Sequence, residues 1–305
     1  MNSKTGVQII AAFMVLTMVL SMTMMFFSGS NSDTTDTIQQ ENLQSEYFNV
    51  PGEQIAHGFS SISDGLQMST TDVYSSYFID MEYINDTSFE PWNEQLSQNL
   101  TIVVPLNSSV TDDVLYNTVT EQLFLAQTFN NDFILLNTMN PKVVTFDYIG
   151  VPSNDSQYLI LKRTDTGGIN VMGDPTLYTP SLYTAEAVIT ILENWTVPQT
   201  AYDTFIPVLN HSDDQSEFQV VVNLIVHPEP FADLYYLGMH KNDDDSFTRT
   251  TIYYNPTNKT SSHINELAET GLERGFTKYE VTTEVNITKV VLSGDFLLVN
   301  TEDIK

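Results

Sequence analysis

The tripeptide Asp165-Thr166-Gly167 is the most direct suggestion of catalytic chemistry in this sequence. In aspartic proteases two such loops face each other, and their carboxylates share one proton while they activate water. This chain has one copy, and the preceding Lys162, Arg163 and Thr164 are not the apolar strand that buries such a dyad. A hairpin turn is therefore the preferred interpretation, because a protease would need the second aspartate from another copy of the chain.

Histidines and carboxylates give two further hypotheses. None of the five histidines belongs to a short zinc-binding pattern; they are His57, His211, His227, His240 and His263. A hairpin that folds back could still gather four ligands, namely His227, Glu229, Asp233 and His240. Paired carboxylates leave no linear signature, so a hydrolase that uses Asp64, Asp80 and Asp174 requires these three side chains to converge in one pocket.

Calcium is the metal that best suits the composition, because hard oxygen ligands are abundant. The densest acidic run is Asn242-Asp243-Asp244-Asp245, which makes Asp243, Asp244 and Asp245 the calcium candidates. The run has neither the glycine nor the distant glutamate of an EF-hand loop, and a solvated hairpin tip explains it equally well. No other cofactor is expected.

The sequence also contains acceptor sites for N-glycosylation, which support an exterior location. They are Asn85, Asn99, Asn107, Asn154, Asn194, Asn210, Asn258 and Asn286. The chain has no cysteine, which excludes disulfides, thiol catalysis and cysteine-based metal sites.

An apolar stretch near the N-terminus predicts a membrane anchor. From Ile9 to Phe27 nearly every residue is apolar and none is charged, and a helix of this length crosses about 28 Å. Lys4 precedes the stretch and acidic residues follow it, so the tip is expected inside and the remainder outside. A cleaved signal peptide is the alternative. Residues 28–46 are polar and predict a flexible stalk.

The excess of acidic residues indicates that the predicted exported part is suited to concentrated salt. The chain has 39 acidic and 11 basic residues, a formal net charge of -28, and 41% hydrophobic residues. Self-repulsion on this scale is screened in concentrated salt, while the apolar content indicates a packed core rather than disorder. The composition is similar to that of proteins from salt-requiring archaea. Nucleic acid is excluded as a partner, because no basic patch replaces its counterions.

The sequence repeats itself in a way that predicts duplication of a folding unit. Residues 116–138 match residues 279–301 at eight of 23 positions, including Asp132 with Asp295. Both blocks predict a β-hairpin, with turns at residues 130–132 and 293–295. The predicted domains are a cytoplasmic tip and anchor (1–27), a stalk (28–46), a first repeat unit (47–145), a connecting segment (146–217) and a second repeat unit (218–305).

Helices are expected within these units. An apolar face predicts one over residues 179–194, capped by Thr179, with Leu182, Ala185, Val188, Ile189 and Leu192 inward. A second begins at Ser261 or Ser262 and stops at Gly275, with Ile264, Leu267 and Leu272 on one face. A short helix is expected at residues 89–96, and two strands about a turn over residues 158–174. Together these patterns predict an α+β fold of two related sheet-and-helix lobes with antiparallel hairpins.

Three phrases carry a resemblance to a known group of proteins. They are VPGEQIAHGFSSISDGLQM from Val50, NVMGDPTLYTP from Asn170 and ERGFTKYEVTTEVNITKVV from Glu273. Together with the N-terminal anchor, this sequence resembles uncharacterised membrane-anchored surface proteins of methanogenic archaea. The resemblance implies a location at the cell surface but carries no known activity.

The function expected from the sequence is that of a single-pass, extracytoplasmic surface protein in the cell envelope of a high-salt organism. Its partners would be the membrane, through residues 9–27, and other envelope proteins or glycans. A binding or structural role is favoured over an enzymatic one, since no catalytic spacing is present. The alternatives are an extracytoplasmic hydrolase that uses carboxylates and a calcium-dependent binding module.

Overall fold

The computed structural model describes residues 45–46, 52–81, 119–140, 143–144, 146–151, 156–194, 199–213, 215–225 and 227–302. The anchor predicted at residues 9–27, nearly all of the stalk and the short helix predicted at residues 89–96 lie outside these ranges. Within them, no helix is long and apolar enough to cross a membrane.

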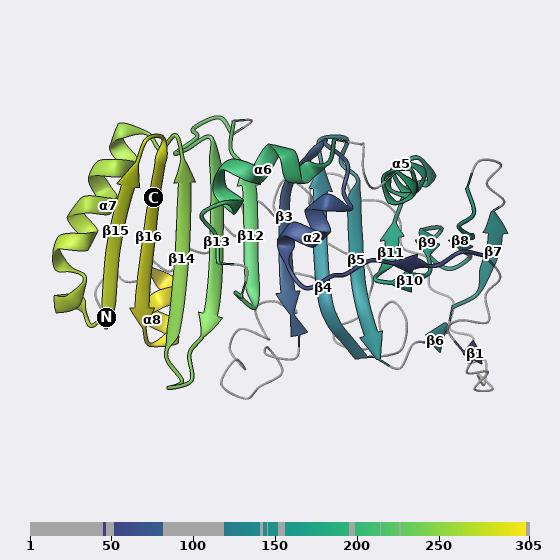
Figure 1. Ribbon diagram of the computed structural model, residues 1–305, viewed down its shortest axis with the longest axis horizontal. Coiled ribbons are helices and arrows are strands. Elements are labelled where there is room, and N and C mark those ends of the chain that lie inside the picture. Colours follow the sequence, from purple (N-terminus) through teal and green to yellow (C-terminus); the bar gives the residue numbers. More distant parts are fainter. Residues whose placement is uncertain are drawn as a thin grey trace, which may run out of the picture.

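The described chain is built on one open sheet in which every neighbouring pair of strands is antiparallel (Figure 1). Its 12 strands follow the order β15-β16-β14-β13-β12-β3-β4-β5-β11-β9-β8-β7. Their bounds are β3 (Val73–Asp80), β4 (Val119–Thr128), β5 (Phe133–Asn140), β7 (Tyr148–Val151), β8 (Ile160–Arg163), β9 (Ile169–Val171), β11 (Thr176–Thr179), β12 (Phe218–Asn223), β13 (Leu234–Lys241), β14 (Phe247–Tyr254), β15 (Lys278–Glu284) and β16 (Ile287–Gly294). The predicted α+β class with antiparallel hairpins is confirmed.

Two short strand pairs accompany the main sheet. β1 (Ser45–Glu46) pairs with β6 (Val143–Val144), and β2 (Ile55–Ala56) pairs in parallel with β10 (Gly173–Asp174). The last two residues of the predicted stalk therefore form a strand beside β6.

Helices pack on both sides of the sheet. α2 (Ile62–Gln67), α5 (Leu182–Glu193) and α6 (Ala201–Leu209) share one buried cluster with residues of one sheet face, which we name the helix face and which is seen in Figure 1. α7 (Asn258–Thr270), the 3-10 turn Leu272–Arg274 and α8 (Phe296–Thr301) follow β14, and Ile264, Phe296 and Val299 belong to the cluster on the opposite face.

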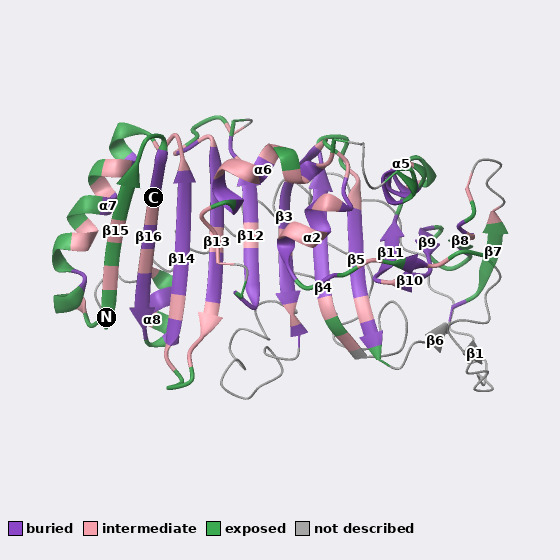
Figure 2. Cartoon of the chain, in the orientation of Figure 1, coloured by how far each residue is buried: buried purple, intermediate pink, exposed green. Residues whose placement is uncertain are grey.

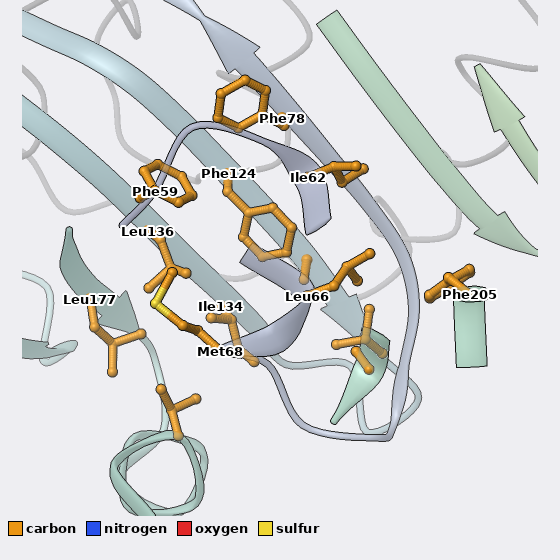
Figure 3. Packing of buried hydrophobic residues seen from close by; sticks show 14 of the residues in the cluster. Phe59, Ile62, Leu66, Met68, Phe78, Phe124, Ile134, Leu136, Leu177 and Phe205 are labelled. Atoms are coloured by element: carbon orange, nitrogen blue, oxygen red, sulfur yellow. The ribbon is translucent and has the colours of Figure 1, made fainter. Parts of the chain in front are cut away.

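The core of the helix face forms where α2 lies on β3 and β4 (Figure 3). Ile62, Leu66, Phe78 and Phe124 are almost fully buried there. Gly65 permits the close approach, because a Cβ atom at this position would come within 2.3 Å of the Phe124 ring. Burying such side chains contributes about 1.5–3 kcal/mol each. Figure 2 shows that exposure is concentrated on the outer helices and the two edge strands, β7 and β15.

The hairpin predicted for the first repeated block is confirmed, whereas the second block folds differently. β4 and β5 meet at a turn in which Asn131 has φ of 60°. In the second block the hairpin of β15 and β16 turns instead at Val285 and Asn286, where Asn286 has φ of 64°. Asp295 caps α8, so residues 296–301 are helical and not a strand. The similarity of the two blocks does not correspond to one repeated structure.

The predicted helices exist, but their starts and faces differ from expectation. α5 is capped by Ser181 rather than Thr179, and α7 is capped by Thr257, before the predicted serines. α7 ends at Thr270, before the predicted stop at Gly275, which has φ of 102° and instead ends the following 3-10 turn. In α5, Leu182 is exposed, whereas the other four residues predicted to face inward are buried. Of the three predicted for the second helix, Ile264 is buried, Leu267 is half-buried and Leu272 is exposed. The helices α2 and α6 were not predicted; α6 contains Pro207, which usually interrupts a helical pattern.

Candidate functional site

Polar side chains follow one line across the helix face, at the strand ends opposite α6. Cross-strand pairing places Thr138 beside Gln122, Gln122 beside Asp80, His240 beside Thr248, and Thr248 beside Ser293. Glu217 stands between Asp80 and His240, since it precedes β12 by one residue and its carbonyl oxygen accepts a 2.7 Å bond from the Asp80 N–H.

Lys278 pairs with Ser293 and ends the line on β15. Residues paired directly across strands project from the same face. We name this set the polar row; its members are Thr138, Gln122, Asp80, Glu217, His240, Thr248, Ser293 and Lys278.

The centre of the polar row is a carboxylate beside an imidazole. Oε1 of Glu217 lies 2.8 Å from Nδ1 of His240, and its Oε2 accepts a 3.2 Å bond from the Lys241 N–H. The Glu217 side chain is 6% exposed and that of His240 is 37% exposed. Nδ1 has no well-aligned hydrogen-bond partner, so the contact is chiefly electrostatic. Burial raises the pKa of Glu217, and the neighbouring His240 and Lys241 N–H offset this only in part.

Hydroxyl groups continue the polar row toward β15. The Oγ atoms of Thr248 and Ser293 lie 2.8 Å apart, and Thr248 Oγ1 also donates to Asn242 Oδ1 at 3.2 Å. Beyond them, Lys278 Nζ lies 3.1 Å from Glu280. The polar row thus offers acceptors and donors along roughly 34 Å, at about 4.8 Å per strand.

The three aspartates of the hydrolase hypothesis lie on separate elements. Asp64 Oδ2 accepts bonds from the backbone and hydroxyl groups of Ser60 and from the Ser61 hydroxyl at the start of α2. Asp174 belongs to the small β10 strand, and Asp80 ends β3. The convergence in one pocket that the hydrolase hypothesis requires is not observed in the described ranges.

The Asp165-Thr166-Gly167 segment is a turn between β8 and β9, as preferred from the sequence. The Asp165 carboxylate receives two bonds from the Arg163 guanidinium, at 3.0 and 2.6 Å, and these lower its pKa. The guanidinium also lies 4.4 Å from the centre of the Phe146 ring. An aspartate held ionised by arginine is unsuited to the shared proton of a protease dyad.

The proposed ligand set of His227, Glu229, Asp233 and His240 does not assemble. Asp233 directly precedes β13, while His240 lies near its end, so roughly 23 Å of extended strand separates them. His227 Nδ1 instead accepts a bond from the Glu229 N–H at 3.2 Å. More generally, the part of the chain that is described holds no group of three or more His, Asp or Glu residues arranged for a metal ion.

The calcium candidates Asp243, Asp244 and Asp245 occupy the tip of the β13–β14 hairpin and are exposed. Asp244 Oδ1 accepts bonds from the Ser246 hydroxyl and N–H, which lower its pKa. Asp245 has φ of 62° and lies 3.2 Å from Lys241 Nζ. These contacts account for the acidic tip as a hairpin turn, and a calcium site there stays a prediction.

Four of the glycosylation candidates fall in the described ranges, and all four are exposed: Asn194, Asn210, Asn258 and Asn286. The hydroxyl residues of the last two sites, Thr260 and Thr288, are buried. Glycans at Asn258 and Asn286 would therefore be added before folding. The other four, Asn85, Asn99, Asn107 and Asn154, lie outside the described residues.

Sequence reasoning missed the pairing of Glu217 with His240. The two residues are 23 positions apart, and nothing in their local sequence marks them. The signal that could have found them is the register of the β12–β13 hairpin, in which Phe218 pairs with Met239. Register depends on the turn between the strands, and the residues between these two strands have no tight-turn motif.

Comparisons with known proteins give no family. No family model, curated protein or solved structure matches this chain. The resemblance to archaeal surface proteins therefore stays an expectation.

Proposed function

We propose that this chain is a membrane-anchored, extracytoplasmic surface protein that binds a component of the cell envelope of a high-salt organism. The apolar stretch at residues 9–27 and the net charge of -28 support the location. The polar row is the observation that supports binding, because it forms a line of hydrogen-bonding groups along one end of the helix face.

The ligand that suits the polar row is extended and rich in hydroxyl or amide groups. Glu217 and Asp80 accept hydrogen bonds, Lys278 donates them, and Thr248 and Ser293 do both. Their regular spacing, about one strand apart, matches a glycan chain or an extended peptide better than a compact molecule.

Cosedimentation with insoluble cell-wall fragments tests this role. Residues 46–305 should sediment with the fragments, and a chain with His240→Ala, Thr248→Val and Ser293→Ala should stay in solution. The matched control carries Thr282→Val and Thr283→Val, which lie on exposed positions of β15 outside the polar row. Equal sedimentation of all three proteins would show that the polar row does not bind the fragments.

A hydrolase remains the second candidate, and the contact of Glu217 with His240 is what favours it. A buried carboxylate 2.8 Å from Nδ1 would stabilise the imidazolium that forms when Nε2 accepts a proton from water or a hydroxyl group. Assays against ester, peptide and glycoside substrates distinguish the two candidates. If the protein is an enzyme, His240→Ala should lower its rate by at least about 100-fold without a change in melting temperature. If it is a binding protein, the natural chain should show no activity on these substrates.

The predicted duplication is proposed with revised units. Two runs of helix and three-strand meander, α2-β3-β4-β5 and α6-β12-β13-β14, lie side by side, and their first strands β3 and β12 pair antiparallel. This arrangement supports two related lobes, each with its own helix on the helix face. If the lobes are units, residues 199–302 expressed alone should unfold cooperatively in urea; a featureless transition would oppose the proposal.

A further inference from the structure

The two edges of the sheet differ in how they meet solvent. β15 carries Lys278, Glu280 and Glu284, all exposed, and charges of this kind discourage the addition of another strand. β7 has no charged residue between Tyr148 and Val151, and Ile149 is 62% exposed. The β7 edge therefore lacks the protection that the β15 edge has.

The hydrogen-bond pattern shows which groups β7 presents at its open side. The Thr164 N–H donates to the Asp147 carbonyl oxygen at 3.1 Å, so Asp147 turns its backbone groups toward β8. Backbone direction alternates along an antiparallel strand, so Ile149 and Val151 also bond β8, whereas Tyr148 and Gly150 point outward. Among the described strands, β7 has no neighbour on that side.

We propose that β7 pairs antiparallel with β7 of a second copy of this chain, so that the two sheets join into one. The register that uses all outward groups places Tyr148 opposite Gly150 of the other copy, and the same pair repeats across the twofold axis. Ile149 then lies opposite Ile149 of the second copy, at the twofold axis. An aromatic ring opposite an edge glycine is a favourable cross-strand pair.

Charge restricts where two copies of this chain can meet. The chain carries a net charge of -28, so most contacts between copies are repulsive. The β7 edge is an uncharged stretch that is complementary to itself. Four residues bury a small area, so the pairing gains most of its strength where copies are concentrated together in one membrane or where salt screens the repulsion.

The absence of native cysteine permits a direct test by crosslinking the full chain in membrane vesicles. Ile149→Cys should form a disulfide-linked dimer under mild oxidation, because Cα atoms of opposed residues at the axis lie about 4.5 Å apart. Val285→Cys is the matched control, since Val285 is 89% exposed but lies at the opposite edge. The dimer fraction for Ile149→Cys should exceed that of the control by at least about tenfold; equal fractions would overturn the proposal.

A second variant leaves β7 unaltered. Lys162 is exposed and pairs with Ile149 from β8, so two Lys162→Cys chains would place their thiols roughly 14 Å apart across three strand spacings. A bis-maleimide of that length should link them, and adding Ile149→Lys should abolish the link. A crosslink that survives Ile149→Lys, or none in Lys162→Cys, would also overturn the proposal.

Discussion

Glu217 is the residue at which burial and charge oppose each other most clearly. Its carboxyl group is nearly buried, and its pKa is raised above the usual 4.5 chiefly by desolvation. A carboxyl group with a raised pKa favours the fold while it is protonated. Its contribution is fully present below its unfolded pKa and is lost as pH rises through the folded pKa.

This predicts how the Glu217→Gln variant responds to pH. The amide keeps the hydrogen-bond acceptor but cannot ionise, so the variant should gain stability relative to the natural chain as pH rises from 4 toward 7. Melting temperatures of both proteins at fixed NaCl measure the difference. Glu280→Gln, which removes the same charge at an exposed position of β15, is the matched control. A difference for Glu217→Gln that is constant or falls with pH would contradict the prediction.

Single residues also show what could be learned from sequence. The turn at Asn131 and the inward residues Ala185, Val188 and Ile189 were predicted because turn chemistry and helical period are local signals. The partner of Glu217 was not predicted, because it depends on the register between strands that a long connection joins.

At the scale of elements, the same sequence phrase folds in two ways because its surroundings differ. In the first block, residues 133–140 lie between β4 and β11 as a central strand. In the second, residues 296–301 leave the sheet as α8, and the carbonyl oxygens of Val299 and of Glu302, the residue after α8, accept bonds from the buried Arg249. The short apolar run at residues 296–299 suits a helix as well as a strand, so tertiary contacts decide the outcome.

The two matching aspartates therefore have different roles, which a pair of variants can separate. Asp295 caps α8 through the Leu297 N–H, and Asp295→Ala should cost about 1 kcal/mol. Asp132 accepts bonds from the Phe133 N–H and the Thr184 hydroxyl group, which ties the β4–β5 turn to α5. Asp132→Ala should cost about 2 kcal/mol. Urea unfolding measures both; an equal or reversed order would contradict these roles.

At the scale of the whole molecule, the sheet joins segments that are far apart in the chain. β3 pairs with β12 across more than 130 residues, and β11 pairs with β5. The strand order and the two edges follow from these distant pairings, so local patterns predicted the α+β class but not the single continuous sheet.

The charge of the whole chain predicts its dependence on salt. The melting temperature should climb by several degrees between about 0.1 and 3 M NaCl, because screening removes self-repulsion. Micromolar calcium at fixed ionic strength tests the alternative of a specific site. If calcium raises the midpoint, Asp243→Asn, Asp244→Asn and Asp245→Asn together should abolish the effect. A midpoint that is indifferent to NaCl would contradict the high-salt interpretation.

The central claim is that the folded part stands outside the cell on an N-terminal anchor, and thiol labelling tests it most directly. Tyr183 is 76% exposed, so Tyr183→Cys in this cysteine-free chain gives a single reactive thiol on the folded part. A membrane-impermeant maleimide should label it in intact cells, while Ser3→Cys at the predicted cytoplasmic tip should be labelled only after lysis. Labelling of Tyr183→Cys only after lysis would contradict the account.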